Sequence, residues 1–287
     1  MIDGRRVVAW IPYGRERTVS ILIEYLRRDV ERGIVDEVWL CLNTDPGQVP
    51  DLRYAYELAK RFPFVRIKDR PTGMPRLHPK QRNTGYFYRY MTDRDTVFVR
   101  FDDDIIYVHD DAVARLVRHK VQTPESVCSF ALIWNNSIVS WFLQQAGIIP
   151  RDFGTVGGPY CMDGVGWASG DFAVKIHRLL LEHIDAGTTE QVFLYQDFPL
   201  KVGMQFSVSC FASLGSRYAD LSMPGVLEPD EEESWHTVHE PRRIDQPNMI
   251  VGNALVSHYT FFPQQREVFE TDILDRYRHI AKELTNG

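Results

Sequence analysis

Short apolar runs alternate with amphipathic segments through the first third of the chain. Runs rich in β-branched and aromatic residues predict buried strands at 7–11, 35–42, 64–67 and 96–101. The segments between them predict helices at 16–31, 51–61 and 81–91. Strands separated by helices indicate βαβ units, so the pattern predicts an α/β fold with a mostly parallel sheet and helices on both faces.

The pattern is less regular in the second half of the chain. Strands are expected at 127–134, 205–212 and 253–257, and helices at 170–183 and 265–284. The stretch 228–247 is polar and contains proline, which predicts a loop. No internal repeat occurs and no linker is long enough to separate two domains, so we expect a single domain over 1–287.

The composition is that of an ordinary globular protein, with 44% hydrophobic and 25% charged residues. The sequence starts without a signal-peptide core, and no apolar stretch approaches the roughly 20 residues of a membrane span. Its four cysteines lie far apart, without the paired spacing of a zinc or redox motif. These features lead us to expect a cytoplasmic protein.

Positive charge is concentrated in one segment of a chain whose net charge is −6. Against the single acid Asp69, this segment carries Arg61, Arg66, Lys68, Arg70, Arg76, Lys80 and Arg82. A local basic patch in an acidic protein indicates a polyanionic partner at one place. Part of that charge could instead serve a diphosphate, and a solvated face without a partner is the alternative.

Three carboxylates, Asp102, Asp103 and Asp104, directly follow the strand at 96–101. Adjacent acids repel one another, so a cation is expected among them. Mg²⁺ and Mn²⁺ take oxygen ligands and keep open positions for phosphate oxygens, so the triplet predicts a metal–diphosphate site. A solvated acidic turn is the alternative. In an extended segment, Asp103 would point away from Asp102 and Asp104.

Polar residues also follow two other predicted strands, at 12–15 and at 43–45. In open α/β sheets, ligands bind beyond the carboxyl ends of the strands. These strand ends and the acidic triplet therefore converge on one edge of the sheet, which favours a nucleotide site there.

In their order, these elements resemble the GT-A fold of nucleotide-sugar glycosyltransferases, most of all the family 2 type, over nearly the whole chain. The matching segments are the loop at 11–15, the polar end at 43–45, the pair Arg82-Asn83, the Asp-x-Asp motif at 102–104, the glycine-rich turn at 166–172 and the late His258. The resemblance implies that 1–109 binds the nucleotide-sugar and the metal, and that 110–287, with the C-terminal helix, holds the acceptor.

The resemblance also implies which residues bind the donor and its metal ion. Mn²⁺ or Mg²⁺ is expected at Asp104, with Asp102 and His258 as further ligands. Asp102 could instead hold the ribose, and His258 could instead be a hydrogen-bonded core histidine. The donor is expected to be a UDP-sugar that contacts Pro12, Gly14, Arg15, Asn43, Asp45, Arg82, Asn83, Asp102 and Asp103.

Transfer to an acceptor hydroxyl requires a base that takes the hydroxyl proton. The family has an acidic pair for this purpose, and this chain offers Gln196-Asp197, with glutamine in place of the usual glutamate. We expect Asp197 to be the base and Asp171 to bind the sugar or the acceptor, with Asp171 as the rival base. Direct displacement would invert the anomeric centre, while retention stays open.

Aromatic side chains, which stack on sugars and bases, gather in the segment at 110–287, at Trp134, Trp141, Phe142, Tyr160 and Trp167. The chain is also similar to TET-associated phage glycosyltransferases, which implies 5-hydroxymethylcytosine in DNA as acceptor and the cytoplasm of a bacterial host as location. A glycan or glycoconjugate precursor is the second acceptor. A sugar nucleotidyltransferase and a DNA-binding module without catalysis are the alternative functions.

Overall fold

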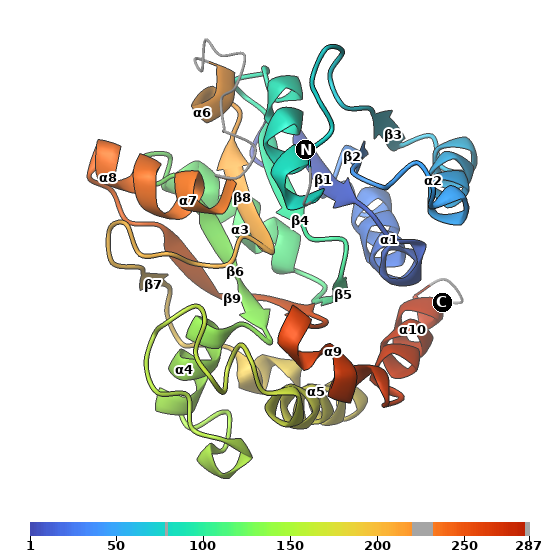
Figure 1. The fold of residues 1–287 in the computed structure, drawn as a ribbon. Coiled ribbons are helices and arrows are strands. Elements are labelled where there is room, and N and C mark those ends of the chain that lie inside the picture. The colour runs from blue at the N-terminus through green and yellow to red at the C-terminus, as the bar shows by residue number, and fades with distance from the viewer. Residues whose placement is uncertain (78–79, 220–231, 285–287) are drawn as a thin grey trace.

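The computed structural model describes residues 1–77, 80–219 and 232–284 (Figure 1). The strands in these ranges are β1 (Val7–Tyr13), β2 (Glu37–Leu42), β3 (Val65–Lys68), β4 (Val97–Phe101), β5 (Ile105–Val108), β6 (Ser129–Trp134), β7 (Phe198–Pro199), β8 (Cys210–Leu214) and β9 (Met249–His258). They form one sheet in the order β3-β2-β1-β4-β8-β6-β9-β5, with β7 paired to β9.

Most strands of this sheet point the same way. β1 pairs in parallel with β2 and β4, β2 with β3, and β6 with β9. β8 is antiparallel to β4 and β6, and β5 and β7 are antiparallel to β9. Six of the nine described strands therefore share one direction, which confirms the predicted α/β fold with a mostly parallel sheet.

Helices flank this sheet (Figure 1). The described helices are α1 (Glu16–Glu31), α2 (Val49–Arg61), η1 (Lys80–Tyr90), α3 (Ala112–Gln122), α4 (Ser137–Gln145), η2 (Arg151–Phe153), α5 (Gly170–Asp185), η3 (Thr189–Val192), α6 (Ser216–Ala219), α7 (Glu232–Ser234), η4 (Trp235–His239), α8 (Glu240–Ile244), η5 (Phe262–Gln264), α9 (Gln265–Phe269) and α10 (Ile273–Glu283). None of them combines the length and the apolar character that crossing a membrane requires.

Strand β1 shows how the two faces of the sheet are filled. Val7 and Ala9 face the larger core, which also contains residues of α1 and α3. Val8 and Trp10 face a smaller core, which contains Tyr88 of η1. This alternation is the period of two expected of a strand that is buried on both faces.

The prediction of a loop at 228–247 is wrong for the part that the structure describes. Residues 228–231 lie outside it, and 232–244 are helical, in α7, η4 and α8. Glu232, His236 and Glu240 recur every four residues and are buried. Each has hydrogen-bond or ion-pair partners inside the protein, so polar residues form the buried face of these helices.

Other boundaries also differ from the predictions. The helix expected at 265–284 is divided into α9 and α10. Between them the Thr271 hydroxyl donates to the Val268 carbonyl oxygen at 2.7 Å, a side-chain to backbone bond that competes with helical pairing. The strand expected at 205–212 begins at Cys210, and the helix expected at 81–91 is the 3-10 helix η1. α3 and α4 lie in segments for which the sequence predicted no helix.

His177 on α5 gives the fold a dependence on pH. Its imidazole is fully buried, 2.9 Å from the Tyr259 carbonyl oxygen, and burial lowers its pKa from 6.5 to about 4. The unfolded chain therefore binds more protons between pH 4 and 6.5, so stability falls as the pH drops through that range. We expect the wild type to lose about 2 kcal/mol from this group between pH 8 and pH 5.

The His177→Gln variant lacks this titration and should not show that part of the loss. Urea unfolding of both proteins at pH 5 and pH 8 measures the difference. Equal pH dependence in the two proteins would contradict the prediction.

Candidate functional site

The acidic triplet lies in the turn that joins β4 to β5. The Asp102 amide donates to the Ser209 carbonyl oxygen, and the Ile105 amide to the Asp102 carbonyl oxygen, which closes the turn. Asp103 and Asp104 are buried, at 8% and 6% exposure, so this segment is not a solvated acidic turn.

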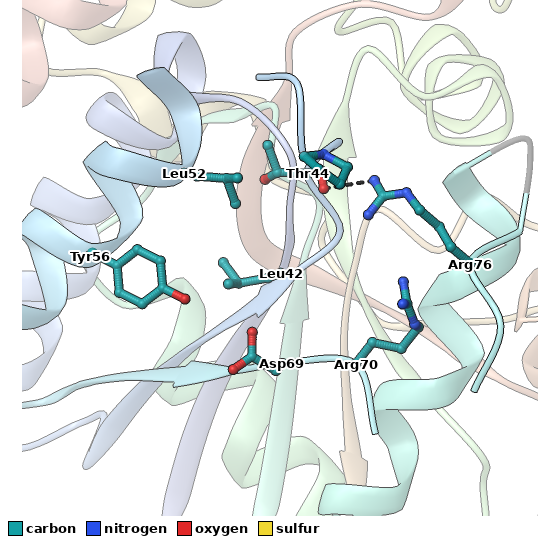
Figure 2. Close-up of a pocket in the computed structure, with 8 residues that line it drawn as sticks. Leu42, Thr44, Leu52, Tyr56, Asp69, Arg70 and Arg76 are labelled. Carbon is teal, nitrogen blue, oxygen red and sulfur yellow. Dashed lines mark hydrogen bonds between the residues drawn. The ribbon is translucent and has the colours of Figure 1, made fainter. Parts of the chain in front are cut away.

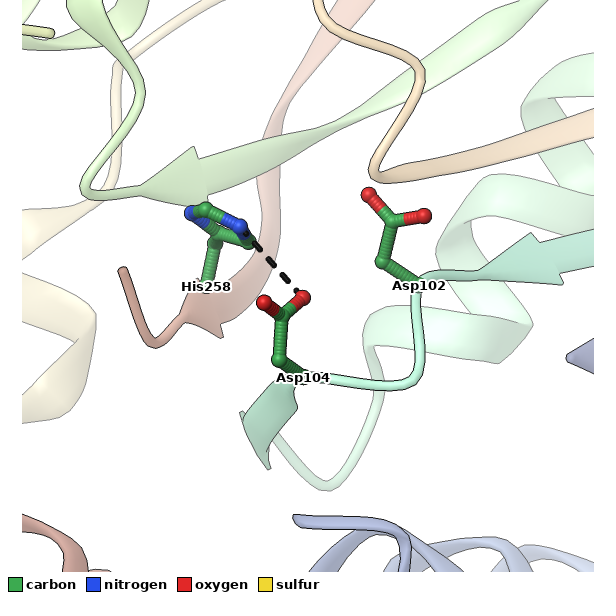
Figure 3. Close-up of side chains that lie close together, drawn as sticks. All are labelled: Asp102, Asp104 and His258. Atoms are coloured by element: carbon green, nitrogen blue, oxygen red, sulfur yellow. Dashed lines mark ion pairs between the residues drawn. The ribbon is translucent and has the colours of Figure 1, made fainter. Parts of the chain in front are cut away.

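The structure brings Asp102, Asp104 and His258 together, as the sequence predicted (Figure 3). One potential ligand atom from each residue lies within 4.8 Å of the others, and His258 Nε2 is 3.4 Å from Asp104 Oδ1. Antiparallel pairing of β5 with β9 places His258 opposite Ile105, directly after the triplet. Two carboxylates and an imidazole in this arrangement fit one divalent ion such as Mn²⁺.

Each acid of the triplet also has a cationic side chain beside it. Asp102 accepts a hydrogen bond from Arg100 at 2.8 Å, while Arg15 binds both Asp103 and Asp104. The cation predicted from charge repulsion is therefore supplied in this structure by protein side chains.

The same contacts determine the pKa values in the cluster. Burial raises the pKa of Asp103 despite its contact with Arg15. Burial also opposes ionisation of Asp104, but His258 and Arg15 outweigh it and hold that pKa below its usual range. The pKa of His258 is raised by Asp104, against the effect of burial. His258 would have to release its proton to serve as a metal ligand.

Asp103 faces the end of β1 rather than the metal cluster. It binds Arg15 through both carboxylate oxygens, with an Arg15 Nε–Oδ2 distance of 3.1 Å. Gly14 leaves room for this contact, since a Cβ atom there would lie 2.8 Å from Asp103 Oδ2. Gly14 and Arg15 thus lie beside the triplet, and Pro12 is buried within β1.

Gly14→Ala should therefore weaken the pairing of Asp103 with Arg15. The carboxylate can rotate away from the added methyl, so we expect a modest loss of about 1 kcal/mol in the free energy of unfolding. Urea unfolding measures this loss. Gly47→Ala is the control, because nothing lies within 4 Å of a Cβ atom there. Equal stability of the two variants would contradict the prediction.

A pocket of about 320 Å³ opens at the carboxyl ends of β2 and β3 (Figure 2). It is lined by Leu42, Thr44, Pro46, Leu52, Tyr56, Asp69, Arg70 and Arg76. Arg76 donates to the Thr44 carbonyl oxygen and to Asp45, each at 2.7 Å. The basic segment therefore folds back over the end of β2 and forms one wall of the pocket.

Asn83 holds the wall of the pocket that Arg76 forms. Its side chain pairs with the backbone of Leu77 in both directions, at 2.8 and 3.1 Å, and donates to Asn43 at 3.3 Å. The structure thus brings Asn43, Asp45 and Asn83 to one end of the sheet, although Asn83 is engaged in holding the loop. The side chain of Arg82 lies outside the described part of the chain.

Asp197 is not brought to the metal cluster. Its Oδ1 accepts a hydrogen bond from the Gly252 amide at 2.8 Å, and its Oδ2 is 3.8 Å from His119 Nε2. Gly252 precedes His258 by six residues on β9, which at about 3.3 Å per residue corresponds to about 20 Å along the strand. The Asp197 carboxylate therefore lies well away from His258 along β9.

Asp171 lies in the first turn of α5 and is 70% exposed. Ser169 caps this helix by accepting a hydrogen bond from the Phe172 amide. In the preceding turn, the Trp167 ring is 6.4 Å from that of Phe261, which in turn is 4.5 Å from the His258 ring. These contacts connect Trp167, which precedes Asp171 by four residues, to the cluster. The exposed Asp171 carboxylate pairs only with Lys175 among the described residues, at 2.6 Å.

Sequence reasoning missed Arg100 and Glu232. Arg100 is 3% exposed and binds both Asp102 and Glu232. A cation inside the apolar run of β4 is a signal for a buried ion pair, but nothing local identifies a partner 132 residues further along the chain.

No family model matches the sequence, and no curated protein matches it. Among solved structures, the chain is similar to glucosyl-3-phosphoglycerate synthase from Mycobacterium tuberculosis, with 16% identity over 65% of this chain and 68% of that one and a TM-score of 0.37. A complex of that synthase with Mn²⁺, UDP and glucosyl-3-phosphoglycerate gives 16% identity, 65% and 67% coverage, and a TM-score of 0.36.

The chain is also similar to a 4-diphosphocytidyl-2C-methyl-D-erythritol synthase. The match has 17% identity and a TM-score of 0.33, and it covers 44% of this chain. It spans 60% of the length of that synthase.

Proposed function

We propose that this protein is a metal-dependent glycosyltransferase that moves a sugar from a nucleotide-sugar, expected to be a UDP-sugar, to an acceptor hydroxyl. One observation carries the proposal: the cluster of Asp102, Asp104 and His258 and the pocket beside β2 lie on one edge of the sheet. β2 and β4 flank β1, so two strand spacings separate their ends by about 10 Å. A nucleoside diphosphate can span such a distance.

The pocket suits the nucleoside end of the donor. Leu42, Leu52 and Tyr56 offer apolar and aromatic surface, while Arg70 and Arg76 add hydrogen-bond donors. At the other end, Arg15 is a partly exposed cation beside the triplet and can contact the diphosphate. Asp102, Asp104 and His258 would hold the divalent ion, which when bound neutralises charge on the departing diphosphate. These residues belong to the half at 1–109, with His258 added from the end of β9.

Asp171 is the base in this proposal, in place of Asp197. As the acceptor oxygen attacks the anomeric carbon, its proton passes to the Asp171 carboxylate. The bond from that carbon to the diphosphate oxygen breaks, and the oxygen keeps the electron pair. A single displacement of this kind inverts the anomeric centre.

The acceptor is proposed to lie over the aromatic side chains next to His258. Phe261 packs on the His258 ring, Trp167 packs on Phe261, and Phe262 is 85% exposed. Aromatic faces of this kind stack on sugars and on extruded bases. We propose 5-hydroxymethylcytosine in DNA as the acceptor and a glycan or glycoconjugate precursor as the alternative.

A sugar nucleotidyltransferase is the second candidate, because the same pocket and ion site suit a nucleoside triphosphate. Nucleotidyltransferases usually begin with a glycine-rich phosphate loop. The corresponding segment of this chain, at 11–17, has a single glycine, Gly14. The products separate the two functions, since a glycosyltransferase releases a nucleoside diphosphate and a nucleotidyltransferase releases pyrophosphate.

The test is to incubate the full chain with Mn²⁺ and a panel of nucleotide-sugars, with and without DNA that contains 5-hydroxymethylcytosine. Nucleoside diphosphate release with a hexose-sized mass gain on the DNA is the expected result. Release without a DNA product keeps the glycosyltransferase and discards the DNA acceptor. Pyrophosphate release from a nucleoside triphosphate and a sugar phosphate would establish the second candidate. No turnover of any donor would contradict both.

A further inference from the structure

A buried ion pair adjoins the metal cluster on the side of Asp102. Arg100 donates to Glu232 Oε1 at 2.7 Å and to Oε2 at 3.1 Å. Its Nη1 donates to Asp102 Oδ1 at 2.8 Å and also to the Val208 carbonyl oxygen. The Tyr88 hydroxyl donates to Glu232 Oε1 at 2.7 Å. Arg100 and Glu232 are only 3% and 8% exposed, so water contributes little to this network.

The strand geometry explains why Arg100 can reach Asp102. Side chains two residues apart on a strand share a face, so positions 100 and 102 point to the same side as β4 ends. Arg100 faces the smaller core, with its guanidinium 5.6 Å from the centre of the Trp10 ring. The paired contact with Glu232 fixes the plane of the guanidinium, and this in turn directs Nη1 at Asp102.

The charges of the network also make Asp102 depend on Glu232. Arg100 carries one positive charge, which two carboxylates share in a water-poor interior where such interactions are strong. If Glu232 lost its charge, Asp102 would become the only carboxylate bound to Arg100 among the described residues. Asp102 would then pair more tightly with Arg100 and have less negative charge available to a metal ion.

We propose that Glu232 is a positioning residue for the metal site. It holds Arg100 in one orientation and shares its positive charge, so that Asp102 stays oriented beside Asp104 and His258 and is not drawn more tightly to Arg100. This inference rests on the proposed function, in which those three residues bind a divalent ion. Outer partners of metal ligands usually change metal affinity by about 10- to 100-fold when they are removed.

The test measures the affinity of the full chain for Mn²⁺ alone, by electron paramagnetic resonance of the free ion. Glu232→Gln keeps the shape and a hydrogen-bond acceptor, and we expect it to bind Mn²⁺ about tenfold more weakly than the wild type. Glu240→Gln is the matched control. Glu240 is also buried, at 5% exposure, and binds Arg243 through both oxygens at 2.6 Å, but no described contact joins it to the cluster. Its variant should bind Mn²⁺ as the wild type does.

Tyr88→Phe provides a milder change should Glu232→Gln fail to fold. It removes only the hydroxyl that donates to Glu232, and we expect a smaller weakening of Mn²⁺ binding in the same direction. If folded Glu232→Gln binds Mn²⁺ with wild-type affinity, the inference is overturned and the proposed metal site stays intact. The same holds for Tyr88→Phe if that is the variant measured. Equal weakening in Glu240→Gln would also overturn it. Failure of the wild type to bind Mn²⁺ would overturn the metal site itself, and the inference with it.

Discussion

Replacing Asp104 with asparagine is expected to abolish Mn²⁺ binding and to lower the rate of sugar transfer by about a thousandfold. Asp104 is the central acid of the cluster, since it contacts His258 at 3.4 Å and Arg15 at 3.2 Å. Asparagine keeps its shape but removes the charge that an ion requires. Mn²⁺ titration and nucleoside diphosphate release from the donor measure the two effects.

Asp103→Asn is the control within the same triplet. Asp103 binds Arg15 and lies outside the group of potential ligands, so its variant should still bind Mn²⁺. Circular dichroism of both variants confirms that the fold is kept. Retention of Mn²⁺ binding in Asp104→Asn would show that the acidic triplet is a structural ion-pair network and not a metal site.

Asp171→Asn is expected to reduce transfer to the acceptor by about 10²- to 10⁴-fold while leaving donor and Mn²⁺ binding intact. The carboxylate is 70% exposed at the amino end of α5, so removing its charge should disturb the fold little. Initial rates at saturating donor, together with the KM for the donor, separate a lost base from weakened binding.

Asp197→Asn tests the competing assignment. Asp197 accepts the Gly252 amide on the stretch of β9 remote from His258, and we expect its variant to transfer sugar at the wild-type rate. If Asp197→Asn is inactive and Asp171→Asn is active, the base is Asp197 and the assignment to Asp171 is wrong.

Local patterns predicted the elements that depend on neighbouring residues. Glu16–Glu31 is helical as expected. Its apolar residues recur at helical spacing, and this pattern is visible in the sequence without knowledge of the elements that pack on the helix. β4 and the acids after it were equally readable, since a short apolar run that ends in charge is a local signal. The segment at 232–244 was not, because its buried polar residues are stabilised by partners elsewhere in the chain.

The two carboxylates considered for the base show where local reasoning ends. Both Asp171 and Asp197 lie beside apolar segments, and the sequence ranked Asp197 first on its resemblance to an acidic pair. β7 pairs with the first residues of β9, at Met249 and Ile250, and this holds Asp197 near Gly252. Such pairing depends on strands 50 residues apart, so no window of the sequence could reveal it.

The sequence by itself determined that polar strand ends would share one edge of the sheet. Parallel order follows from short βαβ units, so the ends after β1, β2 and β4 had to lie on the same edge, and the structure places β1 between β2 and β4. Only the tertiary structure decided which distant side chains complete the site. β5 pairs with β9 and brings His258 to Asp104. α7 packs on the face of the sheet that carries the smaller core, and this brings Glu232 to Arg100. These contacts join residues more than 130 positions apart, and their formation depends on the packing of the whole sheet rather than on any local preference.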